Sequence, residues 1–367
     1  MEIREVELGE FADNILQAAG ESARNRTFGR LFMLFTMRGV TDPRDTIFAM
    51  FNILSEIQGC TTGDLIDYSL SPRKVYLNAT QLWARSSQLR RVSNGLSKET
   101  ELGRSATEIS FFDFVVDFEF NEKLNLPSWV PSWRGTSGAF YENPNFCAAT
   151  RAKPYLNPPD PVLFDDDEIP LLVRGIKLFT VSMLSPVTAD GELSILEHRK
   201  MLSQFVDPYP TTEETFAEVY ESTLDLDASQ SICEGNRPCK FWDVICKQPA
   251  ALPQNTTKDM TGSCVGPFQE SWPIALRPGL FDSKTFKGFT KKRNLFISQD
   301  GFLGLGPPRL KMGDIVCLLF GGAMPYALRK LESERYEFLG YCLVYGIMSG
   351  EALESMPKDR IENFIMV

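Results

Sequence analysis

From Lys292 onwards the chain alternates apolar residues with other residues, a pattern that fits a β-sheet and no regular helix. Five short segments carry this two-residue period: NLFIS, FLGLG, DIVCLLF, YALRKL and YEFLGYCLVYGIM. Turn-forming sequences separate them, among them Asp300-Gly301 and Gly321-Gly322. An Asp-Gly pair between two alternating segments favours a tight β-hairpin. We therefore predict a small antiparallel β-barrel or curled sheet over residues 291–352.

Three glycines within RNLFISQDGFLGLGP raise the question of a phosphate-binding loop. A dinucleotide-binding fingerprint requires a strand, then glycines, then the start of a helix. Here Pro307 and Pro308 follow the glycines, and the next segment is again strand-like. We interpret Gly301, Gly304 and Gly306 as turn residues, which argues against a nucleotide-binding protein.

The first part of the chain has the apolar spacing of helices. In TDPRDTIFAMFNILSEI, Asp42 suits an N-cap and Pro43 the first helical position. Ser71 and Pro72 hold the same positions in SPRKVYLNATQLWARSSQLRRV. The segment LPSWVPSWRG follows, and its prolines exclude a regular helix, so we expect an extended aromatic strap laid across a core.

Together these patterns predict an α+β fold in which a helical N-terminal half packs on the C-terminal barrel or curled sheet. We expect the helical part and its strap in residues 1–140. Residues 141–290 form a connecting insertion with helices and one strand at 171–183, which joins the sheet. The barrel occupies residues 291–352, and residues 353–367 form a C-terminal tail.

Composition excludes several classes of function. The net charge of −10 repels phosphate backbones and anionic lipids, so we expect no nucleic-acid partner. No apolar stretch is long enough to span a bilayer, and the N-terminus has no signal-peptide pattern, so we expect a cytoplasmic protein. The eight cysteines are then expected to be reduced, and their spacing is not that of a zinc site.

Four stretches of the sequence together resemble fungal heterokaryon incompatibility (HET) domain proteins. They are TDPRDTIFAM with IDYSLSPRKVY, then LPSWVPSW, then FISQDGFLGLGPPRLKMGD, and finally FLGYCLVYGIMSGEAL. Their order matches the region that follows the HET core in such proteins, over roughly residues 35–135 and 290–352. The two stretches typical of the core itself do not occur, and we expect the core to be absent from this chain.

The resemblance implies one of two functions. HET-like proteins occur among fungal secondary-metabolite genes, and the resemblance extends loosely to the HET-like Diels–Alderase of sordaricin-type biosynthesis. A chain of this kind is then a cofactor-independent cyclase or isomerase, most simply a [4+2] cyclase, acting on an apolar terpenoid or polyketide. The alternative is a non-catalytic regulator of incompatibility or cell death that binds other proteins.

The residue inventory is compatible with cofactor-free chemistry, because no phosphate loop, dinucleotide fingerprint or metal-ligand spacing is visible. Such an enzyme orients an apolar chain and polarises a carbonyl with hydrogen-bond donors. Our candidate catalytic residues are Arg134, Tyr345 and His198. Candidate substrate-binding residues are the aromatic and basic side chains Trp129, Trp133, Trp242, Trp272, Tyr341 and Arg277.

Each candidate also has a structural interpretation. His198 is the only histidine and sits on a predicted amphipathic helix, where a solvated surface position is the simpler expectation. Trp129 and Trp133 belong to the strap and can simply fill a core. Tyr341 and Tyr345 are expected to project from one face of the last strand, where their phenols could line a cavity.

Overall fold

A computed structural model describes residues 40–49, 66–80, 118–132, 170–185, 208–210, 214–224, 293–320, 324–348, 350–353 and 357–367. It also describes the isolated positions 112, 115, 148, 198, 201–202, 205 and 322. The chain divides into two compact units. The first comprises residues 1–144, 156–172 and 366–367, and the second comprises residues 145–155 and 173–365.

The first unit contains the predicted helix starts. A helix runs over residues 43–49, and the Asp42 carboxylate accepts a hydrogen bond from the Arg44 backbone N–H at 2.9 Å. A second helix runs over residues 72–80, where Ser71 Oγ accepts from the Lys74 N–H at 3.3 Å. Both contacts are N-caps, as the sequence predicted. The remaining residues of these two predicted helices lie outside the described residues.

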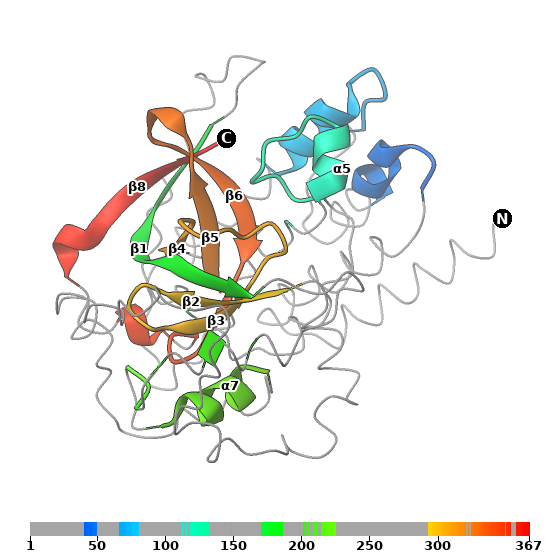
Figure 1. Ribbon diagram of the computed structural model, residues 1–367. Helices are drawn as coiled ribbons and strands as arrows, with labels where there is room; N and C mark the ends of the chain where they lie inside the picture. Colours follow the sequence, from blue (N-terminus) through cyan, green and yellow to red (C-terminus); the bar gives the residue numbers. More distant parts are fainter. Residues whose placement is uncertain are drawn as a thin grey trace, which may run out of the picture. The chain divides into compact units, whose positions relative to one another are not determined.

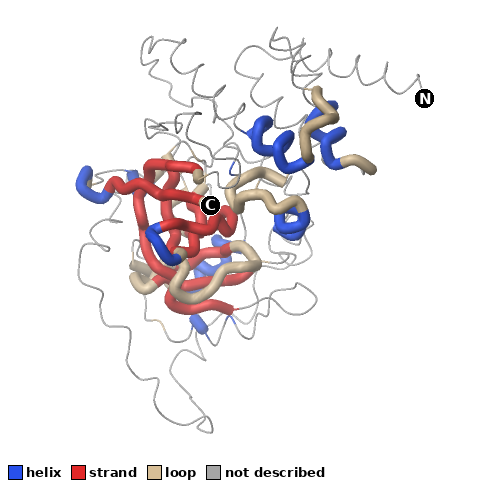
Figure 2. Tube along the Cα trace, turned by 90° about the horizontal axis from the view of Figure 1, so that it is seen from above, coloured by secondary structure: helices blue, strands red, loops and turns tan. Residues whose placement is uncertain are grey.

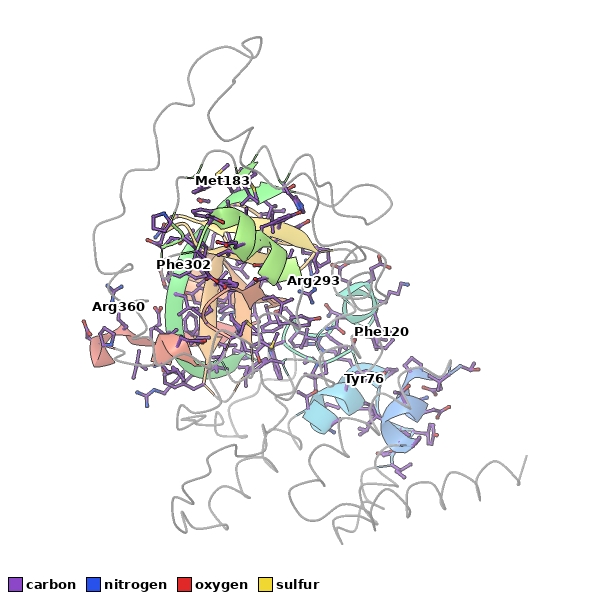
Figure 3. The ribbon with its side chains drawn as sticks, turned by 90° about the horizontal axis from the view of Figure 1, so that it is seen from below. Tyr76, Phe120, Met183, Arg293, Phe302 and Arg360 are labelled. Atoms are coloured by element: carbon purple, nitrogen blue, oxygen red, sulfur yellow. The ribbon has the colours of Figure 1, made fainter. Side chains whose placement is uncertain are left out.

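Aromatic packing and one hydrogen bond connect these helices. The Tyr76 hydroxyl donates to the Pro43 carbonyl at 3.1 Å, and the Tyr76 ring lies 5.4 Å from the ring of Phe120 on helix α5 (Phe118–Lys123). Figure 3 shows Tyr76 and Phe120 on neighbouring helical segments. The strap follows α5. Its Trp129 is buried, and Asn121 Nδ2 donates to the Val130 carbonyl at 2.8 Å. The described part of the strap therefore packs into a core, as expected. It is not extended throughout, because the Val130 N–H donates to the Pro127 carbonyl at 3.1 Å and closes a turn there.

The second unit holds one eight-stranded sheet (Figures 1 and 2). Its strands are β1 (Leu171–Ser185), β2 (Asn294–Ser298), β3 (Leu303–Gly306), β4 (Ile315–Leu319), β5 (Pro325–Lys330), β6 (Arg335–Tyr341), β7 (Leu343–Val344) and β8 (Ile361–Met366). Three short 3₁₀ helices lie between the later strands: η8 (Glu332–Glu334), η9 (Glu351–Leu353) and η10 (Lys358–Arg360). The strand order is β4-β5-β6-β8-β1-β2-β3-β7, with a further pairing between β4 and β1. Because of that pairing, β4, β5, β6, β8 and β1 form a closed ring.

The long strand β1 belongs to both halves of the sheet. Residues 175–180 pair antiparallel with β4, whereas residues 181–185 pair antiparallel with β2. The register shifts once between Lys177 and Phe179 and again between Val181 and Met183. Irregularities of this kind bend a strand and increase its twist, which allows β1 to pass from one partner to the other. The predicted strand at 171–183 is therefore present and joins the sheet.

Helix α7 (Phe216–Leu224) lies beside β3 at the end of the sheet formed by β2 and β3 (Figure 1). The aromatic core beneath it links several elements. The Phe302 ring stacks on Phe179 of β1 at 5.3 Å between centroids, and the ring of Tyr209 meets Phe302 edge-on at 6.2 Å. This core fixes the segment before α7 against the hairpin that joins β2 to β3.

Two expectations about the sheet were wrong. Residues 353–367 are not a tail, because β8 lies in the ring between β6 and β1. Of the three glycines, only Gly301 is a turn residue, with φ of 86°. Gly304 and Gly306 lie inside β3, where a side chain would collide with its neighbours: a Cβ on Gly304 would stand 2.5 Å from the Phe296 ring.

Candidate functional site

Tyr345, one of the three candidate catalytic residues, has a carboxylate partner in the structure. It follows β7 and is buried, and its backbone N–H donates to the Leu303 carbonyl at 3.2 Å. Its hydroxyl donates to Glu214 Oε2 at 2.8 Å. Burial, followed by this hydrogen bond to the carboxylate, raises the pKa of Tyr345 above its usual value. The phenol is therefore a protonated donor whose proton is directed at Glu214.

Tyr209 completes this cluster from the segment before α7. Its hydroxyl accepts a hydrogen bond from the Leu303 N–H at 3.0 Å, and its backbone N–H donates to the Glu214 carbonyl at 2.8 Å. The rings of Tyr209 and Tyr345 meet edge-on at 5.5 Å. Burial raises the pKa of Tyr209 as well. Neither Tyr209 nor Glu214 was anticipated from the sequence, because their contacts with Leu303 and Tyr345 join residues more than 90 positions apart.

His198 is fully buried, so its expected place on a solvated surface was wrong. Its Nδ1 lies 2.9 Å from the hydroxyl of Tyr220 on α7, and the two rings meet edge-on at 5.6 Å. Met201 and Leu202 are buried too, three and four positions further along the chain. That spacing places all three side chains on one helix face, which explains why the histidine points inwards.

Tyr341 and Tyr345 do not share a strand. Tyr341 ends β6, whereas Tyr345 follows β7, so the expectation of two phenols on one strand was wrong. Tyr341 is buried beneath Arg293, whose guanidinium carbon lies 3.9 Å from the centre of the Tyr341 ring. Arg293 Nη1 also donates to the Tyr341 carbonyl at 3.1 Å. Tyr341 and Tyr345 therefore lie in different local environments.

The remaining candidates are distributed as follows. Trp129 is buried in the strap of the first unit. The other proposed ligand-binding and catalytic residues lie outside the described residues: Trp133, Arg134, Trp242, Trp272 and Arg277.

A second polar cluster, not anticipated from the sequence, fixes the loop between β3 and β4. Arg329 Nε and Nη2 donate to the two carboxylate oxygens of Asp314 at 2.9 Å each, and Nη2 also donates to the Arg309 carbonyl at 2.7 Å. The same carboxylate accepts the Lys311 N–H at 2.7 Å. Glu337 on β6 pairs with both Arg309 and Arg329. All of these bonds except the Arg329–Glu337 pair involve a residue of 307–314, a segment we call the β3–β4 loop.

Two cysteines of the sheet, Cys317 and Cys342, are buried free thiols. Burial raises the pKa of Cys342 to about 12, and it raises that of Cys317 as well. Neither thiol is therefore a nucleophile at neutral pH. Among the described residues, no three His, Cys, Asp or Glu side chains gather as metal ligands. The described helices include none with the length and hydropathy needed to cross a membrane.

The closed ring with its β2–β3 extension is the architecture of a small β-barrel domain. Residues 279–367 match the family model of the Het-6 beta-barrel domain. This supports the resemblance to HET-related proteins for that part of the chain, and it includes β8 in the domain. Searches among curated proteins and among solved structures gave no match.

Proposed function

We propose that this protein is a non-catalytic regulator of the HET type that acts by binding other proteins. The observation that supports it is the internal engagement of Tyr345: its ring is buried and its phenol donates its proton to Glu214 of the same chain. His198, held against Tyr220, and Tyr341, held beneath Arg293, have structural surroundings of the same kind. The family match of the barrel to a HET-related domain agrees with this role.

The pairing of the strands limits how a partner binds. Each strand of the ring β4-β5-β6-β8-β1 has a hydrogen-bonded neighbour on both sides. A partner strand that adds to a sheet needs a free edge, and this ring offers none. Binding to the ring therefore relies on side chains and loops.

The β3–β4 loop is the contact surface we propose. Its tip presents Met312, which is 69% exposed, next to the exposed Lys311. Arg329 donates to the Arg309 carbonyl, and the Asp314 carboxylate accepts from the Lys311 N–H; these bonds hold the loop in one conformation, so little entropy is lost when a partner binds it. A flexible thioether adapts well to an apolar pocket. The chemistry fits a protein partner with a small apolar pocket and an acidic rim facing Lys311.

Affinity capture from a fungal extract with the full chain tests this function. We expect at least one protein to be retained specifically, and Met312→Asp to release it. Leu331→Asp is the matched control, because Leu331 is also an exposed apolar residue, at 37%, but lies outside the β3–β4 loop, between β5 and η8. Retention of no protein, or equal retention by both variants and the natural chain, would contradict the proposal.

A second candidate function is the cofactor-independent cyclase acting on an apolar terpenoid or polyketide. The feature that favours it is a buried phenol paired with a carboxylate, a combination that can hold or move a proton where water is scarce. Incubation of the chain with apolar extract metabolites, followed by mass spectrometry, would reveal a product of equal mass and altered retention time. Tyr345→Phe should abolish that conversion, and unchanged conversion would remove Tyr345 from the chemistry.

A further inference from the structure

Ser71 lies in a sequence context that its N-cap position does not explain. It is followed by Pro72, and Lys74 stands three positions after it. Proline has no N–H and offers a rigid apolar ring, so an enzyme can select it at the next position with an apolar pocket that contains no acceptor. A basic residue three positions on can pair with an acidic group of the same enzyme. This is the substrate pattern of proline-directed serine/threonine kinases.

The chain contains one other Ser-Pro pair, Ser185-Pro186, and no Thr-Pro pair. Ser185 is buried at the end of β1, and its third following residue is Thr188 rather than a basic one. Ser71 is exposed. Each serine is followed by a proline, but only Ser71 is exposed and has a basic residue three positions later. Ser185 therefore serves as an internal control.

Local geometry presents the Ser71 hydroxyl outwards. The preceding residues form a turn in which the Leu70 N–H donates to the Asp67 carbonyl at 3.3 Å and the Ser69 N–H donates to the Asp67 carboxylate at 2.8 Å. Ser71 itself is not helical. Its backbone carbonyl accepts the Val75 N–H at 3.1 Å, and its hydroxyl accepts the long N-cap bond of 3.3 Å from the Lys74 N–H. A weak bond to a main-chain N–H is readily exchanged when an enzyme engages the hydroxyl.

We propose that Ser71 is a phosphorylation site for a proline-directed kinase with a preference for a basic residue at the third following position. The Ser71 oxygen attacks the γ-phosphorus of Mg-ATP, the bond from that phosphorus to the β,γ-bridging oxygen breaks, and ADP leaves. The hydroxyl proton passes to the catalytic base of the kinase. The proposal goes beyond the regulatory function above and does not depend on it.

Phosphorylated Ser71 would lie close to the N-terminus of a helix and to the Arg44 guanidinium. A phosphoserine carries a charge of about −1.5 to −2 at neutral pH, which is favourable at the N-terminus of the helix over residues 72–80. Arg44 Nη1 already donates to the Leu70 carbonyl at 2.9 Å, one residue before the site, while Nη2 pairs with Asp42 at 2.7 Å. A phosphate on Ser71 competes with Asp42 for this guanidinium. The modification therefore acts on the connection between the two capped helices.

The test uses the full chain in its folded state with a purified cyclin-dependent kinase, Mg-ATP and peptide mapping by mass spectrometry. We expect the initial rate of phosphorylation at Ser71 to exceed that at Ser185 by at least tenfold. Lys74→Gln should slow the reaction severalfold. Ser71→Asn should remove the modified peptide, and since Asn is also a good N-cap, the variant keeps the helix start intact.

Three outcomes would overturn the proposal. The first is a folded chain that takes no phosphate at Ser71 while the heat-denatured chain does, which would show that the site is covered. The second is equal modification of Ser71 and Ser185. The third is no modification of Ser71 in either state, which would show that the local sequence is not a substrate.

Discussion

Arg329 and Asp314 form a two-pronged ion pair in which Nε and Nη2 each lie 2.9 Å from a different carboxylate oxygen. Asp314 precedes β4 and Arg329 lies on β5, so the pair spans two adjacent strands at the base of the β3–β4 loop. Asp314 is almost wholly buried, and its carboxylate also accepts the Lys311 N–H. This one contact therefore couples the shape of the proposed binding loop to the stability of the ring.

Replacement of Arg329 by Met should lower the free energy of unfolding by about 2–3 kcal/mol, because it leaves a buried carboxylate without its counter-charge. The full penalty of a deeply buried pair is not expected, since the Arg329 side chain is 22% exposed. Urea unfolding followed by circular dichroism measures the change. Lys330→Met is the matched control: its pair with Glu334 is exposed, at 53% and 76%, and should leave the midpoint unchanged. Equal losses of stability in both variants would show that the Arg329–Asp314 pair contributes no more to folding than the exposed Lys330–Glu334 pair.

The buried tyrosines should make stability fall at alkaline pH. The pKa values of Tyr209 and Tyr345 are raised by burial above the usual 10.0, so above that pH the unfolded chain binds fewer protons than the folded chain. The stability that these two phenols contribute is therefore fully present below pH 10 and decreases as the pH rises beyond it. Urea titrations between pH 9 and 11 should show this slope, and Tyr345→Phe should reduce it. An unchanged slope in the variant would mean that its phenol ionises normally.

Short-range sequence patterns were sufficient to predict part of this fold. The N-caps Asp42 and Ser71 were predicted because capping depends on neighbours two or three positions away. Strand β8 was missed because only Phe364 and Met366 of its six residues are buried, so its apolar alternation is too short to stand out. The pairing of Tyr345 with Glu214 joins residues 131 positions apart, and no local pattern encodes it.

The two thiols of the sheet should be unreactive in the folded protein. With a pKa of about 12 for Cys342 and a raised value for Cys317, the thiolate fraction at pH 8 is far too small for alkylation. Iodoacetamide treatment followed by peptide mapping should leave both cysteines unmodified in buffer and modify both in 6 M guanidinium chloride. Alkylation in buffer at the rate of the unfolded chain would contradict their burial.

Gly304 and Gly313 should respond differently to alanine, since they are glycines for different reasons. A Cβ on Gly304 would lie 2.5 Å from a Phe296 ring carbon and 2.6 Å from the Leu343 carbonyl oxygen. We expect Gly304→Ala to cost about 2–3 kcal/mol by overpacking, and Phe296→Leu in the same chain to recover part of that loss. A Cβ on Gly313 would meet nothing within 4 Å, but its φ of 91° disfavours a side chain, so Gly313→Ala should cost about 1 kcal/mol. Phe296→Leu should not rescue this second variant. Denaturant titration of the four chains measures these differences, and rescue of both glycine variants by the same leucine would show that the losses have a common, non-local cause.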